Sequence, residues 1–234
     1  MMIFPKKTRI FQAKESLADF IFEEIPKIKN GSILVITSKI VALSQGRIVE
    51  KKMNRKEKEE WIEKESDNFY KTKWCYLTLK EDHWCANAGI DESNVESGGL
   101  ILWPDNIYEE AEKLRKKLLK EYGIKNLGVL VTDSRIFPLR SGVTGVALGY
   151  AGFQGLRNYI GKKDIFGRKL KMTKTNIADS LASAAILVMG EGNEKIPLAV
   201  IEDAPVRFTD KKINKKELLI KPENDIYRRL YENL

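Results

Sequence analysis

The 234-residue sequence contains only two cysteines, Cys75 and Cys85, and a single histidine, His83. Two cysteines are too few for a disulfide framework and do not have metal-site spacing, so we expect reduced thiols and a cytoplasmic protein. His83 is expected to be a hydrogen-bonded structural residue rather than a general base. The N-terminus lacks an apolar core of signal-peptide length, and no stretch approaches the roughly 20 apolar residues of a membrane helix. We therefore expect no membrane partner.

The sequence also lacks the common phosphate-binding motifs. The pattern G-x-x-x-x-G-K-[ST] is absent. The segment GYAGFQG at 149–155 does not have G-x-G-x-x-G spacing, and GEGNEK at 190–195 ends in Lys195 where the third glycine would fall. A nucleotide site in this chain must therefore be built from other residues.

Basic residues are in excess, with 41 Lys and Arg against 33 Asp and Glu and a formal charge of +8. Such an excess favours anionic partners, namely nucleic acid, a membrane surface, or phosphorylated and carboxylated small molecules. The Lys-rich stretches at 51–64 and 211–221 are interleaved with acidic residues, so we interpret them as solvated faces. A hydrophobic content of 43% supports one domain or two closely packed lobes, and no linker marks a boundary.

Hydrophobic periodicity predicts a chain of mixed helices and strands. The predicted helices are 16–26, 54–70, 107–122 and 176–189. The third is expected to end at Gly123 and the fourth at Gly190. The predicted strands are 33–36 and 127–131, both buried, and 76–79, 99–103 and 197–201. Residues 136–170 are rich in glycine. Because the elements do not alternate strictly, the pattern is typical of an α/β or α+β protein.

Four polar clusters follow apolar elements, where scaffolds often carry reactive groups. They are Ser38-Lys39, Asp91 with Asn94, Asp133-Ser134, and the run Gly190–Glu194. Carboxylates such as Asp91, Asp133 and Glu191 suit magnesium or manganese shared with phosphate oxygens. Lys39 suits a phosphate, and Arg140 or Arg168 a carboxylate or phosphate. These are the parts of a site for phosphoryl transfer or carboxylate activation.

Each cluster also has a structural interpretation. Asp91 and Asn94 are residues that form Asx turns, Asp133 is suited to cap a turn, and Glu191 is suited to the solvated end of a helix. Spacing alone leaves both interpretations open.

Taken together and in order, the clusters resemble the family of coenzyme F420-0:γ-glutamyl ligases. The resemblance covers most of the chain. It is carried by ITSKIVALSQGRIV at 36–49, ANAGIDESNV at 86–95, VTDSRIFPLRSGVTGVALGYAG at 131–152, and DIFGRKLKMTKTNIADSLASAAILVMGEGNEKIPLAVI at 164–201.

The resemblance implies a ligase that depends on GTP and on Mg²⁺ or Mn²⁺. Such an enzyme joins the amino group of L-glutamate to a carboxylate of an anionic acceptor, F420-0, through an acyl phosphate. It also implies an α+β fold of mixed sheets with flanking helices, unrelated to P-loop enzymes. In this expectation, residues 1–234 form a single catalytic unit that works as an intertwined homodimer.

Matched by motif, several residues acquire expected roles. Asp91 and Asp133 correspond to catalytic metal ligands. By charge rather than by motif, Arg140 and Arg168 are expected to reduce repulsion between the anionic substrates. The full set of expected metal ligands is Asp91, Asp133, Ser134 and Glu191. The expected nucleotide contacts are Ser38, Lys39, Asn94 and the segment 187–194, which includes Met189, Gly190, Gly192 and Glu194; the segment Thr8–Phe11 is a looser match.

The sequence departs from the family pattern at three places. Leu43 stands where a second lysine is expected, Asp133-Ser134-Arg135 replaces D-T-x, and Glu191 replaces a glutamine. The 131–153 version resembles a bacterial subgroup predicted to act in folate metabolism, so the acceptor is either F420-0 or a folate. The number and linkage of added glutamates and the choice of GTP or ATP also stay open.

Two other classes of function remain. A nucleic-acid-binding protein would use the Lys-rich stretches with Trp61 or Trp74, but its acidic clusters would be unexplained. A relative that binds nucleotide without catalysis is suggested by Leu43. The acidic clusters favour the ligase, without a nucleic-acid partner.

Overall fold

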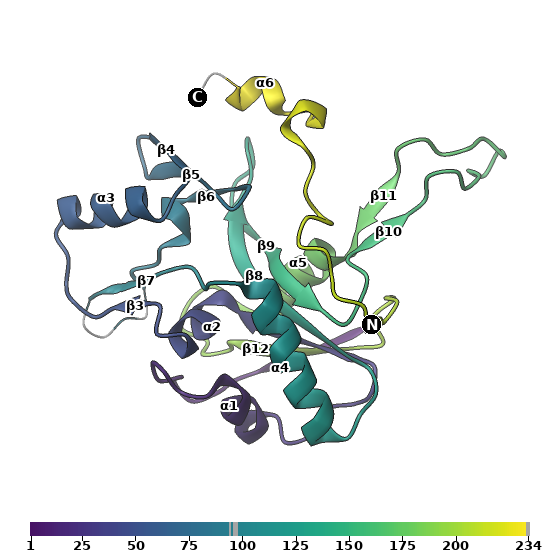
Figure 1. Cartoon of the computed structure of the whole chain (residues 1–234), viewed down its shortest axis with the longest axis horizontal. Coiled ribbons are helices and arrows are strands. Elements are labelled where there is room, and N and C mark those ends of the chain that lie inside the picture. The colour runs from purple at the N-terminus through teal and green to yellow at the C-terminus, as the bar shows by residue number, and fades with distance from the viewer. Residues whose placement is uncertain (94, 96–97, 233–234) are drawn as a thin grey trace. The chain divides into compact units, whose positions relative to one another are not determined.

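The computed structural model describes residues 1–93, 95 and 98–232. Helices and strands are mixed, and the fold is α+β as expected from the sequence. The chain divides into two compact units (Figure 1). Unit 1 contains residues 1–46 and 104–217, and unit 2 contains residues 47–103 and 218–234.

Unit 1 is built on a five-stranded sheet in the order β1-β12-β2-β8-β9. β2 and β8 are parallel, and the other neighbouring pairs are antiparallel. β2 and the first half of β8 are continuous aliphatic runs because these central strands are buried. In chain order the strands are β1 (Met2–Lys6), β2 (Ser32–Thr37), β8 (Leu127–Ile136), β9 (Val143–Ala151) and β12 (Leu198–Glu202).

Two long helices pack closely on β9 through glycines. A Cβ added to Gly149 would lie 2.7 Å from Ile107 of α4, and one added to Gly145 would lie 2.4 Å from the carbonyl oxygen of Ala182 in α5. Figure 1 shows α4 in front of the sheet and α5 behind it. The helices of unit 1 are α1 (Leu17–Glu24), α2 (Ser38–Ser44), α4 (Ile107–Tyr122) and α5 (Ile177–Met189).

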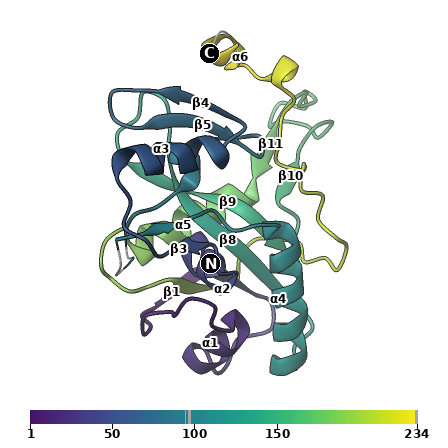
Figure 2. The same cartoon turned by 60° about the vertical axis from the view of Figure 1, so that its left-hand side comes forward.

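The glycine-rich segment of unit 1 forms strand β9 and then a projecting arm. The arm is an antiparallel hairpin of β10 (Leu156–Asn158) and β11 (Lys174–Asn176), and both views show it extending away from the sheet (Figures 1 and 2). Within the arm, Arg168 pairs with Asp164 at 3.1 Å. Arg168 is therefore engaged in shaping the end of the hairpin.

Unit 2 surrounds a small apolar core made by helix α3, strand β7 and the segment before it. Ile62, Ala88, Ile90 and Leu100 are buried there. Helix α3 begins with a capping box, in which Asn54 and Glu57 bond each other's backbone N–H groups. The elements are β3 (Ile48–Val49), α3 (Arg55–Lys64), β4 (Asn68–Lys71), β5 (Tyr76–Lys80), β6 (His83–Ala86), the 3-10 turn η1 (Asn87–Gly89), β7 (Leu100–Ile101), the 3-10 turn η2 (Pro222–Asn224) and α6 (Arg228–Tyr231).

Three predicted elements have different boundaries in the structure. The helix predicted at 54–70 ends at Lys64, because residues 68–71 pair with β5 as strand β4. The strand predicted at 99–103 is confined to Leu100–Ile101. The strand predicted at 127–131 continues to Ile136, because β9 pairs along its whole second half. Within the described part of the chain, every helix is too short or too polar to cross a bilayer.

Candidate active site

One end of the sheet of unit 1 gathers several of the residues singled out by the sequence. In the parallel pair, Thr37 of β2 lies opposite Thr132 of β8. Ser38 and Asp133 are the next residues of the two segments, so they follow the last pair of the parallel ladder at the same level. The carboxyl ends of parallel strands lie at one edge of a sheet, which is where α/β proteins often bind ligands.

The loop before β12 reaches the same end of the sheet. Leu198 at the start of β12 pairs with Ile36 on one side and with Lys6 on the other. The N–H of Thr37 donates to the carbonyl oxygen of Pro197 at 3.0 Å, and the N–H of Thr8 donates to that of Lys195 at 2.9 Å. Residues 195–197, which directly follow the run 187–194, are therefore held between Thr8 and the end of β2.

Asp133 and Ser134 lie inside β8 rather than after it, which corrects the expectation that they follow the strand. A register shift between Val131 and Thr132 precedes them. Beyond it, Asp133 and Ser134 are half-buried, and the Oδ1 atom of Asp133 accepts a hydrogen bond from the Ser134 N–H at 2.9 Å. The extended backbone shows that Asp133 does not cap a turn.

Glu191 contacts this strand directly. The Oγ atom of Ser134 donates to Oε1 of Glu191 at 2.6 Å, joining residues 57 positions apart in the sequence. Glu191 follows the end of α5, where Gly190 has a φ of 83°. The structure therefore brings together one carboxylate and the hydroxyl that the resemblance assigns to a metal ion, and Asp133 is the neighbour of Ser134 along the strand.

The other residues of the run 187–194 divide into core and loop. The side chain of Met189 is buried in the core, which leaves only its backbone for a ligand. The carboxylate of Glu194 accepts from the N–H of Gly192 at 2.8 Å, and a Cβ on Gly190 would meet Glu194 at 2.5 Å. Glu194 and the two glycines thus shape the loop that carries Glu191.

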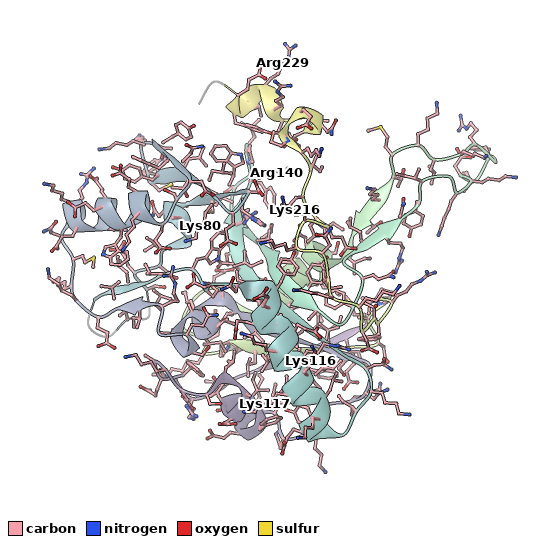
Figure 3. All side chains as sticks on the ribbon, viewed as in Figure 1. Lys80, Lys116, Lys117, Arg140, Lys216 and Arg229 are labelled. Atoms are coloured by element: carbon pink, nitrogen blue, oxygen red, sulfur yellow. The ribbon has the colours of Figure 1, made fainter. Side chains whose placement is uncertain are left out.

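Ser38 and Lys39 begin helix α2, immediately after β2. The side chain of Ser38 is buried, and that of Lys39 is half-buried. Arg140 lies in the turn between β8 and β9, where it is exposed (Figure 3). The turn begins after Ile136, three residues beyond Asp133, so Arg140 is on the same hairpin as the carboxylate.

In unit 2, Asp91 is anchored by its backbone. Its N–H and carbonyl groups both bond Ile101, at 2.9 and 2.8 Å. Its Oδ1 atom accepts from the Ser93 N–H at 2.6 Å, which is an Asx turn. An Asx turn at Asp91 is therefore confirmed, and its role as a metal ligand stays a prediction. Asn94 lies outside the described residues.

The small residues before Asp91 have a packing role. Asn87, Ala88 and Gly89 adopt positive φ angles of 50°, 55° and 69°. Ala88 is fully buried, and a Cβ on Gly89 would lie 3.2 Å from the ring of Trp103. A larger side chain would not fit between this turn and the indole, which explains the run of small residues.

His83 takes part in the same packing. Its Nδ1 atom lies 2.7 Å from the carbonyl oxygen of Glu81, and its ring meets Trp103 edge-on at 6.0 Å. The sequence-based expectation of a hydrogen-bonded structural histidine fits this geometry.

The chemistry of the unit 1 group suits a hard divalent cation. Mg²⁺ usually binds one or two protein carboxylates and completes its coordination with water and substrate phosphates. Asp133 and Glu191 carry carboxylates and Ser134 carries a hydroxyl, so each residue is a donor of this kind, and Ser134 and Glu191 are in contact. Within the described residues, no three His, Cys, Asp or Glu side chains gather closely enough to hold a metal ion by themselves. A cation here would therefore depend on further oxygen ligands, such as substrate phosphates.

Comparison with known proteins shows a match to a protein family. The family model described as F420-0:Gamma-glutamyl ligase matches residues 6–203. A protein of Methanocaldococcus jannaschii named Coenzyme F420:L-glutamate ligase is 37% identical over 218 residues, covering 86% of both chains. A protein of Archaeoglobus fulgidus with the same name is 32% identical over 231 residues, covering 92% of this chain and 91% of the relative.

Other relatives match over a shorter region. A protein of Methanococcus maripaludis with the same name is 47% identical over 144 residues, which is 62% of this chain and 56% of the relative. The chain thus spans little more than half the length of this relative. The match with F420-0:Gamma-glutamyl ligase ends at residue 203, so residues 204–234 lie outside it.

Proposed function

Because the chain belongs to the F420-0:gamma-glutamyl ligase family, we propose that it is a ligase that joins L-glutamate to a carboxylate of a coenzyme acceptor. The names of the relatives that match over most of their length support this activity. The observation that carries the proposal is the contact between Ser134 and Glu191 beside Asp133, at the end of the sheet where Ser38 also lies.

The proposed reaction has two steps. A carboxylate is a poor electrophile, so an oxygen of the acceptor carboxylate first attacks the γ-phosphorus of GTP, and GDP leaves. The amino group of L-glutamate then attacks the carbonyl carbon of the acyl phosphate, inorganic phosphate leaves, and the amine loses a proton. A bound Mg²⁺ or Mn²⁺ would neutralise phosphate charge and align the reacting oxygens.

The residues of unit 1 have distinct proposed roles. Asp133 and Glu191 hold the cation, and Ser134 orients Glu191 through their hydrogen bond. Lys39 meets the nucleotide phosphates with Ser38 at the start of α2. The loop that Glu194 shapes contacts the nucleotide through its backbone, because Met189 is buried and the glycines carry no side chain.

Asp91, Asn94 and Arg140 complete the proposal on the strength of the resemblance and of their chemistry. Asp91 is a further metal ligand, and Asn94 a nucleotide contact. Arg140 lowers repulsion between the acceptor and glutamate, which are both anions. We also propose that the active protein is a homodimer, which light scattering coupled to size-exclusion chromatography would measure.

The test is GDP release by the purified chain with L-glutamate and either F420-0 or a reduced folate, with GTP compared with ATP. Asp133→Asn and Glu191→Gln are expected to abolish ligation while the thermal unfolding transition is retained. Asp203→Asn is the matched control, because Asp203 follows the other end of β12 and pairs with Lys29. Near-wild-type turnover of Asp133→Asn at saturating Mg²⁺ or Mn²⁺ would refute the assigned metal role.

The same assay separates the alternatives. Product formed with the folate alone identifies a folate γ-glutamate ligase. Binding of GTP without GDP release, under every acceptor tested, identifies a non-catalytic nucleotide-binding protein; Leu43 is the residue that suggests it. That residue is half-buried in α2, and its carbonyl oxygen accepts from the N–H of Lys14 at 2.8 Å. Leu43→Lys would restore the expected family pattern, and we expect this variant to have a lower KM for the nucleotide.

A further inference from the structure

A cavity opens to solvent between three helices of unit 1, namely α1, α2 and α4. Its volume is about 380 Å³, which lies within the range of small-molecule sites, roughly 300–1,000 Å³. Helix α1 contacts both α2 and α4 around it (Figure 1). All residues that line the cavity belong to unit 1, so the cavity is complete within this unit.

The inner wall of the cavity is apolar. Val131 of β8, Val41 of α2 and Ala111 of α4 line it, and each is at most 2% exposed. Leu17 of α1 and Leu114 of α4 are half-buried and complete this wall. An apolar group of a ligand that covers such a wall releases water from it, which favours binding.

Three lysines also line the cavity: Lys14 before α1, and Lys113 and Lys117 on α4. All three are exposed, so they form the rim of the cavity rather than its inner wall. Lys117 pairs with Asp19 at 3.1 Å, and the two side chains are 52% and 70% exposed. An exposed pair of this kind contributes little to stability, so Lys117 is able to exchange Asp19 for the anionic group of a ligand.

Two carboxylates line the cavity as well, and both are already paired. Glu15 accepts two hydrogen bonds from the guanidinium of Arg9, which holds the pKa of Glu15 below its ordinary value. Glu110 accepts a hydrogen bond from Lys113 at 2.7 Å. Lysines therefore outnumber carboxylates by three to two in the lining, and Glu15 is bound by a further cation outside it. This balance favours an anionic ligand.

Lys14 is fixed at the rim by its backbone. Its φ is 64°, a conformation that favours glycine, and its N–H donates to the carbonyl oxygen of Leu43 at 2.8 Å. The stem of Lys14 packs on Gly46, where an added Cβ would lie 3.5 Å from both Cγ and Cε of the lysine. Strained residues of this kind are concentrated at ligand sites. A lysine where glycine would be less strained therefore indicates a use for the side chain.

The cavity is separate from the proposed nucleotide contacts, although α2 borders both. Val41 and Ser44 are the residues of α2 that line the cavity. Lys39 and Leu43 are about one turn apart and share a face of the helix, whereas Val41 lies midway between them in the sequence and faces the other way. A ligand in the cavity would thus meet α2 from the side opposite to Lys39.

We propose that this cavity binds a small organic anion, with a compact apolar body and a carboxylate, sulfonate or phosphate group. The apolar body covers the wall that includes Val41, Leu114 and Val131. The anionic group meets Lys14 and Lys117, the latter in exchange for Asp19. The inference goes beyond the proposed function, because it adds a second binding site on the other face of α2.

Fluorescence titration of the purified chain tests the site, with 8-anilinonaphthalene-1-sulfonate as the probe. N-phenyl-1-naphthylamine has the same rings without the sulfonate and is the matched neutral probe. We expect the sulfonate probe to bind at one site per chain, about fivefold more tightly than the neutral probe, which is the effect of one exposed ion pair. Equal affinities of the two probes would overturn the proposal.

Ser44 offers a pair of variants that separates filling of the cavity from loss of a contact. Its Oγ atom donates to the carbonyl oxygen of Val41 at 2.7 Å, so Ser44→Ala and Ser44→Leu lose the same hydrogen bond. Ser44→Ala keeps the cavity open and should retain the affinity for the sulfonate probe. Ser44→Leu fills the cavity and should weaken binding about tenfold or more. Thermal unfolding followed by circular dichroism verifies that both variants fold, and wild-type affinity in a folded Ser44→Leu would overturn the proposal.

Charge variants test the rim. Lys14→Gln and Lys117→Gln are each expected to weaken binding of the sulfonate probe about two- to fivefold and to leave the neutral probe unaffected. Lys116→Gln is the matched control, because Lys116 is the neighbour of Lys117 on α4 (Figure 3), is 71% exposed and pairs with Glu112 at 3.5 Å. The same sulfonate affinity in all three variants would contradict the assigned role of the lysines and overturn the proposal.

Competition with GTP separates the cavity from the nucleotide site. GTP at a concentration equal to that of the probe should not displace it, because the proposed nucleotide contact Lys39 lies on the other face of α2. Displacement would assign the cavity to the nucleotide and overturn the proposal. The result is independent of ligation: absence of ligation with every acceptor contradicts the proposed function, whereas wild-type probe affinity in Ser44→Leu contradicts the cavity site.

Discussion

Glu65 is the centre of a charged cluster in unit 2, and its replacement gives the sharpest test of how this unit is held together. One oxygen of Glu65, Oε2, accepts hydrogen bonds from both Arg47 and Lys80, each at 2.6 Å. The side chains of Glu65 and Lys80 are only 10% and 11% exposed. Glu65→Gln removes the negative charge and leaves two cations that face a neutral amide.

Breaking a buried ion pair by removal of one partner costs about 3–5 kcal/mol, because the remaining charge stays desolvated. Glutamine keeps an acceptor oxygen and Arg47 is 22% exposed, so we expect about 3 kcal/mol, the lower end of the range. If the free energy of unfolding decreases by about 1.5 kcal/mol per molar urea, the urea concentration at the unfolding midpoint of unit 2 should fall by about 2 M.

Tryptophan fluorescence isolates this transition. All four tryptophans of the chain, at positions 61, 74, 84 and 103, belong to unit 2. The control is Glu63→Gln, two residues away on an exposed position of α3, which should leave the midpoint within about 0.5 kcal/mol of wild type. An unchanged midpoint for Glu65→Gln would show that the cluster does not stabilise the unit.

The pH dependence supplies an independent check. Burial alone would raise the pKa of Glu65, but the hydrogen bond from Lys80 and the charges of Lys80 and Arg47 outweigh it and hold the pKa below its ordinary value of 4.5. The contribution of the carboxylate is therefore complete above pH 4.5 and is lost as the pH falls through the lowered pKa. The stability difference between wild type and Glu65→Gln should narrow in that acid range.

Three further predictions concern the packing of both units. Gly145→Ala would place a Cβ 2.4 Å from the backbone oxygen of Ala182. We therefore expect the free energy of unfolding, measured in urea, to fall by several kcal/mol, or the protein to be insoluble. Unchanged stability would contradict the close approach of α5. Tyr122→Phe loses a hydrogen bond to the carbonyl oxygen of Ile25 and should cost about 1 kcal/mol. Burial raises the pKa of Tyr122 to about 12, so wild-type stability should fall between pH 10 and 12 and the variant should lack this part of the fall. Asn54→Ala removes the cap of α3 and should lower the stability of unit 2 by about 1 kcal/mol, and an unchanged tryptophan-monitored midpoint would contradict the cap.

Elements with a complete local signal were predicted well from the sequence. The helix at 107–122 has a continuous apolar face and a glycine at 123 with a φ of 64°, and its bounds agree with α4. The strand predicted at 33–36 is the buried centre of β2. These signals are local, because helical periodicity and the end of a helix depend on residues a few positions apart.

Elements that depend on distant partners were predicted poorly. Residues 68–71 continue a charged, helix-favouring stretch, yet they form a strand because β5 pairs with them. Strand β9 was not predicted, because its glycines respond to the close approach of α4 and α5 rather than to turns. Asp133 was expected after its strand for the same reason: the length of β8 is set by β9.

The sequence by itself determined the chemical inventory of the candidate site: hard oxygen donors, a lysine after a buried strand, and no P-loop. It also identified the family through motifs whose order is preserved. Only the tertiary structure decided that Ser134 reaches Glu191, and that Ser38 and Asp133 both follow the last pair of the β2–β8 ladder. The physical reason is that strand register arises from hydrogen bonds between segments that are distant in the sequence. β8 pairs with β2, about 100 residues earlier, and the bulge after Val131 forms where β8 pairs with β9. No local sequence pattern encodes either pairing.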